Sequence, residues 1–304
     1  MANLETKLQN QNIINNNFLS YSKSLFQLMK PRVMSLVIFT CVVGLIVAPL
    51  QVDIFTATFS LISVAFGAGA AGALNMWYES DLDALMKRTC LRPIPTGKVS
   101  SNEALIFGII IAFLSVMSLY FVANFISALM LAITIIFYVV IYTIWLKKRT
   151  AQNIVIGGAA GAFPPIIGWT IAMGNISLEP ILLFLIIFFW TPSHFWALSM
   201  YKTEDYANAK IPMLPIVSGI KTTKTNIFVY SIILFFISLT PYFFGFAGNI
   251  YLFTSIALGI YYVYLCYMLL VKSNEDKILS KKIFIYSILY LFLIFSIILI
   301  DNIV

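Results

Sequence analysis

Residues 54–100 read IFTATFSLISVAFGAGAAGALNMWYESDLDALMKRTCLRPIPTGKVS. The first part of this stretch is apolar and long enough to cross a bilayer, which takes about 20 residues in a helix. The second part follows without a spacer and brings three carboxylates and four cations into one short loop. Acidic side chains at the mouth of a membrane span are costly to keep, so this loop predicts a functional site.

The rest of the chain has the composition of a membrane protein. Of its 304 residues, 61% are hydrophobic and 10% are charged, and the mean hydropathy is +0.95, unlike a soluble domain. We expect an all-α polytopic bundle, with residues 33–304 as a single transmembrane domain. Apolar runs predict about nine transmembrane helices, at 33–50, 54–77, 102–121, 125–146, 153–173, 179–200, 226–244, 250–271 and 283–301.

The cations fall on alternate loops. All 19 Lys and Arg residues either precede the first predicted helix or follow the second, fourth, sixth and eighth. The positive-inside rule then places the N-terminus and these loops in the cytoplasm. Residues 1–32 become a cytoplasmic segment, in which the mixed apolar and Lys pattern of residues 18–30 fits an interfacial helix. The net charge of +7 is explained by topology and attraction to membrane lipid, and gives no indication of nucleic-acid binding.

Three polar side chains of the opening stretch share one predicted helix face. Asn75, Glu79 and Asp83 are spaced by four residues, so they stack along a helix that leaves the membrane. Lys87 continues the row, whereas Asp81 points away from it. Two carboxylates and an amide oxygen are the hard ligands that hold Mg²⁺, with substrate phosphates completing its shell. We therefore expect Mg²⁺ as the cofactor.

Cations follow these acids directly. Arg92 and its neighbours could bind a diphosphate, because guanidinium groups match phosphate oxygens in a bidentate way. The predicted catalytic set is Asp83, Glu79, Lys87 and Arg88, with Arg92 binding diphosphate. The alternative is that Glu79 and Asp83 only pair with Lys87 and Arg88 in a solvated helix end.

A second acidic cluster follows the sixth predicted helix. Glu204 and Asp205 lie at its cytoplasmic end and complete the predicted Mg²⁺ ligands. Both acidic clusters are followed by an Ile-Pro turn, at Ile94 and Ile211. This likeness predicts two four-helix repeats plus a ninth helix, with the two acidic mouths facing each other on one side of the membrane.

The fourth and fifth predicted helices add two further features. The mouth of the fourth helix carries Lys147, Lys148 and Arg149, which could reach a diphosphate, although topology alone would also place them there. Gly157 and Gly161 in the fifth helix are spaced by four residues, as in helices that approach each other closely.

Paired acids, Mg²⁺ and cations above an apolar bundle are typical of a site for a diphosphate whose tail lies in the membrane. We expect an isoprenyl diphosphate, and ionisation of its allylic C–O bond with the leaving diphosphate stabilised by metal and Arg. A membrane transporter is the alternative from another class. Transporters, however, usually keep their ionisable residues near the membrane midplane.

Four blocks of the sequence carry a family resemblance. They are LMKPRV at 28–33, NMWYESDLDALMKRTCLRPIP at 75–95, KKRTAQNIVIGGAAGAFPPIIGW at 147–169 and WTPSHFWALSMYKTEDYANAKIPMLP at 190–215. With them the chain resembles the protohaem IX farnesyltransferase (haem O synthase) family of the intramembrane prenyltransferase superfamily. Glu79 stands where this family usually has Asp. Tyr201 or Lys202 stands where the superfamily's second motif has a further Asp, which leaves one or two metal ions open.

The resemblance implies a specific reaction and place. The family transfers a farnesyl group from farnesyl diphosphate to a vinyl group of protohaem IX (haem B, a substrate), with addition of water, to give haem O and diphosphate. This reaction serves haem A and cytochrome oxidase cofactor biosynthesis, with a haem A synthase downstream. The expected location is the bacterial cytoplasmic (inner) membrane. A prenyltransferase acting on a quinone-precursor aromatic acid is the nearer alternative, because residue chemistry alone does not choose the acceptor.

The segment HFWAL at 194–198 suggests how haem is held. His194 is the single histidine of the chain and lies about 15 Å deeper than Glu204 if the helix is continuous. Imidazole is a common axial ligand of haem iron, so His194 and Trp196 are the predicted haem-binding residues. The alternative for His194 is a neutral side chain bonded to a neighbouring helix.

Overall fold

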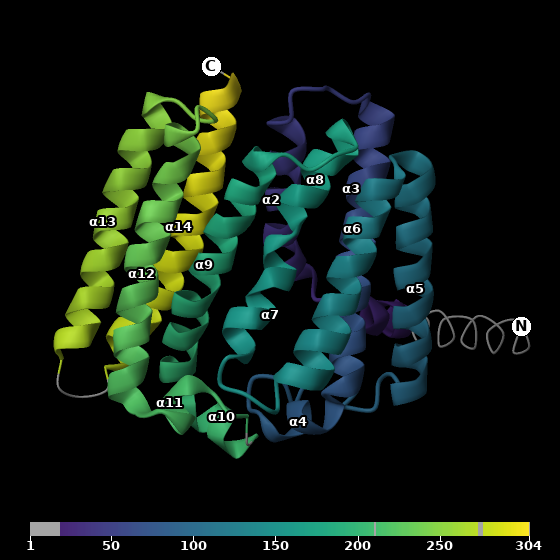
Figure 1. Ribbon diagram of the computed structural model, residues 1–304. Helices are drawn as coiled ribbons and strands as arrows, with labels where there is room; N and C mark the ends of the chain where they lie inside the picture. Colours follow the sequence, from purple (N-terminus) through teal and green to yellow (C-terminus); the bar gives the residue numbers. More distant parts are fainter. Residues whose placement is uncertain (1–18, 210, 273–275, 304) are drawn as a thin grey trace, which may run out of the picture.

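The computed structural model describes residues 19–209, 211–272 and 276–303. This part of the chain is a bundle of helices standing side by side (Figure 1). Eight helices are long and apolar enough to cross a membrane, and a ninth span results when Leu19–Leu28 and Pro31–Ile46, which meet at 53°, are taken together. The prediction of about nine membrane helices is thereby confirmed for the described residues.

The long elements follow the predicted order. They are α2 (Pro31–Ile46), α3 (Ile54–Tyr78), α5 (Ser101–Val122), α6 (Phe125–Ile136) continued by the π-helix η1 (Phe137–Leu146), α7 (Asn153–Ala162) and α8 (Pro164–Met173), α9 (Leu178–Tyr201), α12 (Gly219–Phe243), α13 (Asn249–Val271) and α14 (Lys277–Ile303). Three short helices, α4 (Ser80–Leu85), α10 (Thr203–Asn208) and α11 (Leu214–Val217), lie together at one end of the bundle (Figure 1).

Local sequence signals explain where the helices begin and end. Asp53 caps α3 by accepting hydrogen bonds from the N–H groups of Phe55 and Thr56, both at 3.0 Å. The fifth span breaks into α7 and α8 at Pro164, which cannot continue the hydrogen-bond ladder. Gly174 ends α8 in the left-handed conformation, with φ 65°. The fifth predicted span therefore ends at Met173, the last residue of the range expected for it, and Gly174 caps it.

The helix expected at 33–50 ends at Ile46, and two further predicted boundaries were wrong. The helix expected at 226–244 begins at Gly219, and the one expected at 283–301 begins at Lys277. The additional turns are polar and contain Lys221 and Lys281. A search for apolar runs omits such turns, although the backbone hydrogen bonds continue through them.

Two large apolar clusters form most of the interior. One joins α2, α3, α5, α6, η1 and α8, and the other joins α2, α7, α8, α9, α11, α12, α13 and α14. The helices α2 and α8 approach at backbone distance, since a Cβ on Gly168 would lie 2.0 Å from the carbonyl oxygen of Cys41. The two halves of the bundle are thus packed together through α2 and α8.

The helical segment Leu19–Leu28 packs on the bundle before α2. Its Leu28 is fully buried in an apolar cluster with Ala73 of α3 and Ala104 of α5. Residues 1–18 of the predicted cytoplasmic segment lie outside the described residues.

Candidate functional site

The predicted row of Asn75, Glu79 and Asp83 forms at the junction of α3 and α4. The N–H of Glu79 donates to the carbonyl of Asn75 at 3.0 Å, and the N–H of Asp83 donates to that of Glu79 at 2.8 Å. The four-residue spacing therefore survives the break between the two helices. All three residues are buried, with 2%, 4% and 3% of their surface exposed.

Each member of this row is paired with a cation. Lys147 Nζ donates to Oε2 of Glu79 at 2.6 Å, and one guanidinium nitrogen of Arg92 lies 2.8 and 2.6 Å from the two oxygens of Asp83. Lys30 Nζ donates to Oδ1 of Asn75 at 2.6 Å. The Asn75 amide nitrogen in turn donates to Thr143 Oγ1 at 3.0 Å. The mouth of the bundle thus holds three buried acidic and amide side chains (Asn75, Glu79 and Asp83) paired with three half-buried cations (Lys30, Arg92 and Lys147). These six residues are here called the acidic row with its cations.

The alternative of a solvated helix end is wrong for these acids. Glu79 and Asp83 are buried, whereas Lys87 and Arg88 are exposed and do not provide the ion pairs. Lys87 also leaves the predicted row. The reason is that α4 ends at Leu85 and Met86 adopts extended backbone angles. Asp81 is exposed, as its offset from the row predicts.

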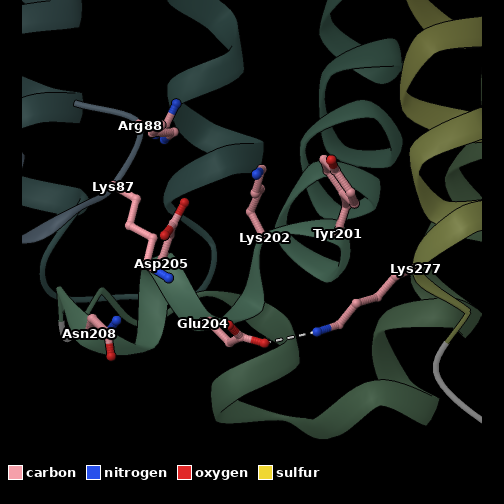
Figure 2. A pocket seen from close by; sticks show the side chains of 8 residues that line it. All are labelled: Lys87, Arg88, Tyr201, Lys202, Glu204, Asp205, Asn208 and Lys277. Atoms are coloured by element: carbon pink, nitrogen blue, oxygen red, sulfur yellow. Dashed lines mark hydrogen bonds and ion pairs between the residues drawn. The ribbon is translucent and has the colours of Figure 1, made fainter. Parts of the chain in front are cut away.

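The second acidic cluster lies on the short helix α10. Glu204 is exposed and forms an ion pair with Lys277 at 3.0 Å (Figure 2). The hydrogen bond from Lys277, together with its charge, lowers the pKa of Glu204 below the ordinary value. Asp205, the next residue, is buried. The two acids therefore occupy different environments, although the sequence treats them alike.

A pocket of about 390 Å³ joins the loops that carry the two clusters. Lys87 and Arg88 of the first loop line it together with Glu204 and Asp205 of the second (Figure 2). The remaining lining residues are Tyr201, Lys202, Asn208 and Lys277. The two mouths therefore meet at one end of the bundle.

Tyr206 connects the two loops. The guanidinium of Arg88 lies 5.5 Å from the centroid of the Tyr206 ring and within 3.5 Å of its hydroxyl, a cation–π arrangement. Beneath it, Met86 and Ile211 belong to the same buried apolar cluster as Tyr206. This cluster fixes the distance between the two acidic loops.

Lys148 takes a different position from its neighbour Lys147. Its ammonium lies 5.1 Å from the centroid of the Tyr78 ring and its side chain is exposed. It therefore stays at the mouth of the bundle, but it contacts an aromatic ring at the end of α3 and not the acids.

The donor set of the acidic row suits Mg²⁺. Within the described residues, no three His, Cys, Asp or Glu side chains lie close enough to hold a metal ion among themselves. Mg²⁺ is, however, usually held by one or two carboxylates together with substrate phosphates. Both carboxylate oxygens of Glu79 lie close to Lys147 Nζ, at 2.5 and 2.6 Å. The carboxylates of Glu79 and Asp83, beside the Asn75 amide oxygen, supply the hard oxygen atoms that such an ion needs.

The structure places His194 against α14, apart from the acidic row. Its Nδ1 lies 2.6 Å from Ser287 Oγ, and its ring stacks on Trp190 at 4.1 Å and on Phe284 at 4.7 Å between centroids. Trp196 lies on another face of α9, with its ring edge-on to Tyr230 of α12 at 5.3 Å.

Two residues of this mouth were not found from the sequence as site residues. Lys30 adopts a left-handed backbone, with φ 53°, directly before Pro31, a conformation that is uncommon outside Gly and concentrated at functional sites. Thr143 is buried in the π-helix η1. The Lys-Pro dipeptide was a usable signal for Lys30, because the residue before Pro is driven out of the right-handed helical region. Nothing in the local sequence distinguishes Thr143.

Comparisons with known proteins agree with this architecture. The model of the UbiA prenyltransferase family matches residues 36–288. The chain is 60% identical over 304 residues to a protein named protoheme IX farnesyltransferase from Pelagibacter ubique, covering 99% of both chains. It is 51% identical to a protein of the same name from Parvibaculum lavamentivorans, covering 92% of this chain and 89% of the relative.

Solved structures share the fold at low sequence identity. A digeranylgeranylglyceryl phosphate synthase superposes with a TM-score of 0.78 at 19% identity, covering 93% of this chain and 99% of that one. A UbiA homologue from Archaeoglobus fulgidus, bound to DMAPP and Mg²⁺, superposes with a TM-score of 0.67 at 18% identity, covering 90% and 99%. With a family match over most of its length, this multi-pass membrane protein belongs to the UbiA prenyltransferase family.

Proposed function

We propose that this enzyme transfers the farnesyl group of farnesyl diphosphate to a vinyl group of protohaem IX, giving haem O and diphosphate. The observation that carries the proposal is the acidic row with its cations, in which the acids are buried at the mouth of the bundle and paired with half-buried cations. The names of the relatives at 60% and 51% identity support haem as the acceptor. The DMAPP and Mg²⁺ bound to a protein of the same fold support a prenyl diphosphate as the donor.

The acidic row is the proposed metal site. Mg²⁺ bound there would neutralise charge on the diphosphate and so make it a better leaving group. The residues proposed to hold the ion are Asn75, Glu79 and Asp83, with Glu204 and Asp205 from the second loop. Those proposed to contact the diphosphate are Arg92, Lys148, Lys87 and Arg88.

In this proposal the cations of the acidic row also compensate the charge of the buried carboxylates before the substrate binds. Lys147 and Arg92 neutralise Glu79 and Asp83 in the structure. When a cation and a diphosphate enter together, the carboxylates and the ammonium and guanidinium groups can exchange partners without leaving a buried charge uncompensated. The site thus binds the charged end of the substrate in a part of the membrane protein where an isolated charge would be unfavourable.

Besides farnesyl diphosphate and protohaem IX, the reaction needs only water to balance. The allylic C–O bond of farnesyl diphosphate breaks, and its electron pair leaves with the diphosphate. The farnesyl C1 bonds to the terminal carbon of the vinyl group, and water adds to the adjacent carbon and loses a proton. The product carries a hydroxyethylfarnesyl side chain.

His194 and Trp196 remain the proposed haem-binding residues. Ser287 Oγ donates its own proton to the carbonyl of Phe284 at 2.7 Å, so it must accept from His194 at Nδ1. The proton is then on Nδ1, and Nε2 keeps a lone pair for a ligand. A second hydrogen bond that fixes the tautomer in this way is usual for metal-ligating histidines.

The proposed setting is the bacterial cytoplasmic (inner) membrane, with residues 33–304 as one domain. Lys- and Arg-rich connections lie at the end of the bundle that carries α4, α10 and α11 (Figure 1), and this charge bias supports a cytoplasmic active site. The product would be consumed by a haem-oxidising enzyme of the haem A synthase kind.

The test is an assay of the purified protein in detergent with Mg²⁺ and farnesyl diphosphate, offered haem in one reaction and 4-hydroxybenzoate in a parallel one, in which mass spectrometry follows both acceptors. We expect a hydroxyethylfarnesyl haem, and its loss when Mg²⁺ is chelated. Prenylation of 4-hydroxybenzoate with haem unchanged would overturn the proposal that haem is the acceptor, but would leave farnesyl diphosphate as the donor. Unchanged haem, farnesyl diphosphate and 4-hydroxybenzoate would overturn the prenyltransferase proposal for this chain.

A further inference from the structure

Asn75 is held on both sides of its amide group. Its Oδ1 accepts from Lys30 Nζ at 2.6 Å, and its Nδ2 donates to Thr143 Oγ1 at 3.0 Å. The side chain is buried, with 2% of the residue exposed. An amide in this position offers either an oxygen or a nitrogen to an approaching cation, depending on which way it is turned.

Hydrogen-bond chemistry decides the orientation of this amide. A Lys ammonium has donors only, so the atom facing Lys30 must be the oxygen. The Thr143 hydroxyl gives its proton to the carbonyl of Tyr138 at 2.8 Å, so its oxygen can only accept from Asn75. The two neighbours therefore impose the same orientation independently, which is the criterion for assigning an amide.

The π-helix makes the Thr143 contact available. Thr134, in the α-helical part of the same span, bonds to the carbonyl four residues earlier, at Met130. Thr143 bonds to the carbonyl five residues earlier, as the wider register of a π-helix allows. Such π segments are rare and are frequent at functional sites.

We propose that Thr143 is a positioning residue for the metal site: it holds Asn75 with the amide oxygen toward the acidic row, where the oxygen serves as a Mg²⁺ ligand. In the structure Lys30 donates to that oxygen. The inference rests on the proposed function, because it takes Asn75 as a ligand. It assigns Thr143 no contact with metal or substrate.

The first test measures binding of Mn²⁺, a spectroscopic stand-in for Mg²⁺, by electron paramagnetic resonance. The full-length protein is used in detergent with farnesyl diphosphate and without haem, so that no turnover occurs. Loss of an outer hydrogen-bond partner typically weakens metal binding by about 10- to 100-fold, and we expect this loss for Thr143→Val. Thr143→Ser, which keeps the oxygen, restores binding. Thr134→Val is the matched control and binds as the unmodified protein does.

A double-mutant cycle separates positioning from packing. A carboxylate in place of the Asn75 amide has two equivalent oxygens, so its orientation no longer matters. In the Asn75→Asp background, Thr143→Val should therefore leave Mn²⁺ affinity unchanged, whereas a packing defect would persist there. The coupling between the two positions is the quantity that the cycle isolates. Thr143→Ala takes the place of Thr143→Val if the latter is not monodisperse on gel filtration.

The outcomes are distinguishable. If the unmodified protein binds Mn²⁺ with farnesyl diphosphate and Thr143→Val binds it equally well, the inference is overturned while the proposed function stands. An equal loss of affinity in the unmodified and Asn75→Asp backgrounds also overturns it. If the unmodified protein shows no Mn²⁺ binding, the metal site itself fails, and the role of Thr143 fails with it.

Discussion

Lys147 and Glu79 form a buried ion pair between residues 68 positions apart, with Nζ 2.6 Å from Oε2. The side chains are 13% and 4% exposed. Glu79 lies between α3 and α4, and Lys147 follows η1, so the pair joins the second span to the fourth. The fourth span thereby contributes directly to the charge balance of the acidic row.

Removing Lys147 should destabilise the protein. Lys147→Met leaves Glu79 buried without a cation, and loss of one partner of a buried pair typically costs about 3–5 kcal/mol. Thermal unfolding in detergent should therefore show a clearly lower midpoint for Lys147→Met. Adding Glu79→Gln to the same chain should restore part of the lost midpoint, because the uncompensated charge is removed. Arg149→Met, which removes an exposed cation two residues away, is the control. Equal midpoints for Lys147→Met and Arg149→Met would contradict a buried pair.

Asp83 and Asp81 should differ sharply in their effect on turnover. Asp83→Asn keeps the volume but removes the charge that Arg92 now contacts, and we expect activity to fall by about 10²- to 10³-fold, as when a stabilising group for developing charge is lost. Asp81→Asn removes an exposed carboxylate from the same short helix and should leave activity nearly unchanged. The measurement is haem farnesylation at saturating substrates. Near-normal turnover by a folded Asp83→Asn protein would remove the metal-site assignment.

The sequence predicted what is local in this site. Asn75, Glu79 and Asp83 could be placed on one face because the i→i−4 hydrogen bonds continue through the junction. Lys87 could not be excluded from the row, because the end of α4 depends on the packing of Met86 in the cluster beneath Tyr206. The membrane spans could be predicted from the sequence because the part of each helix that crosses the bilayer must be predominantly apolar.

The partners of the acids were beyond local patterns. Lys30 and Lys147 reach the acidic row from the first and fourth spans, and their pairing follows from how the helices pack. Thr143 depends additionally on a π-helical register. These features belong to the tertiary structure, so spacing along the chain carries no sign of them.

Glu204 and Asp205 should not be equivalent. Asp205 is buried, whereas the side chain of Glu204 is 78% exposed and pairs with Lys277. We expect Asp205→Asn to raise the Mg²⁺ concentration needed for half-maximal activity more than Glu204→Gln does. A titration of activity with Mg²⁺ measures both, and a larger effect of Glu204→Gln would reverse the ranking.

Gly157 and Gly161 should respond oppositely to Ala. A Cβ on Gly157 would lie 2.1 Å from Cδ2 of Tyr142, whereas a Cβ on Gly161 meets nothing within 4 Å. The close approach predicted from their spacing therefore applies to Gly157 and was wrong for Gly161. Overpacking at Gly157→Ala should cost about 1–3 kcal/mol, and Gly161→Ala should be neutral or stabilising, because Ala restricts the unfolded chain. Unfolding midpoints in detergent measure both effects. Combining Tyr142→Leu with Gly157→Ala should restore part of the stability lost by Gly157→Ala, because the ring that the new Cβ contacts is removed.

His194 offers the sharpest test of how haem is bound. Nδ1 is hydrogen-bonded to Ser287, so Nε2 is the ring nitrogen whose lone pair is available to coordinate iron. His194→Ala should therefore weaken haem binding more than farnesyl diphosphate binding. Absorption titrations with haem, and displacement of a labelled prenyl diphosphate, measure the two affinities on the same preparation. Ser287→Ala should weaken haem binding less than His194→Ala does, because it releases the ring without removing the ligand. Ser296→Ala, a control on the outer face of α14, should change neither. Equal losses of haem and diphosphate binding on His194→Ala would instead mean that this histidine packs α9 against α14 and that haem is held elsewhere.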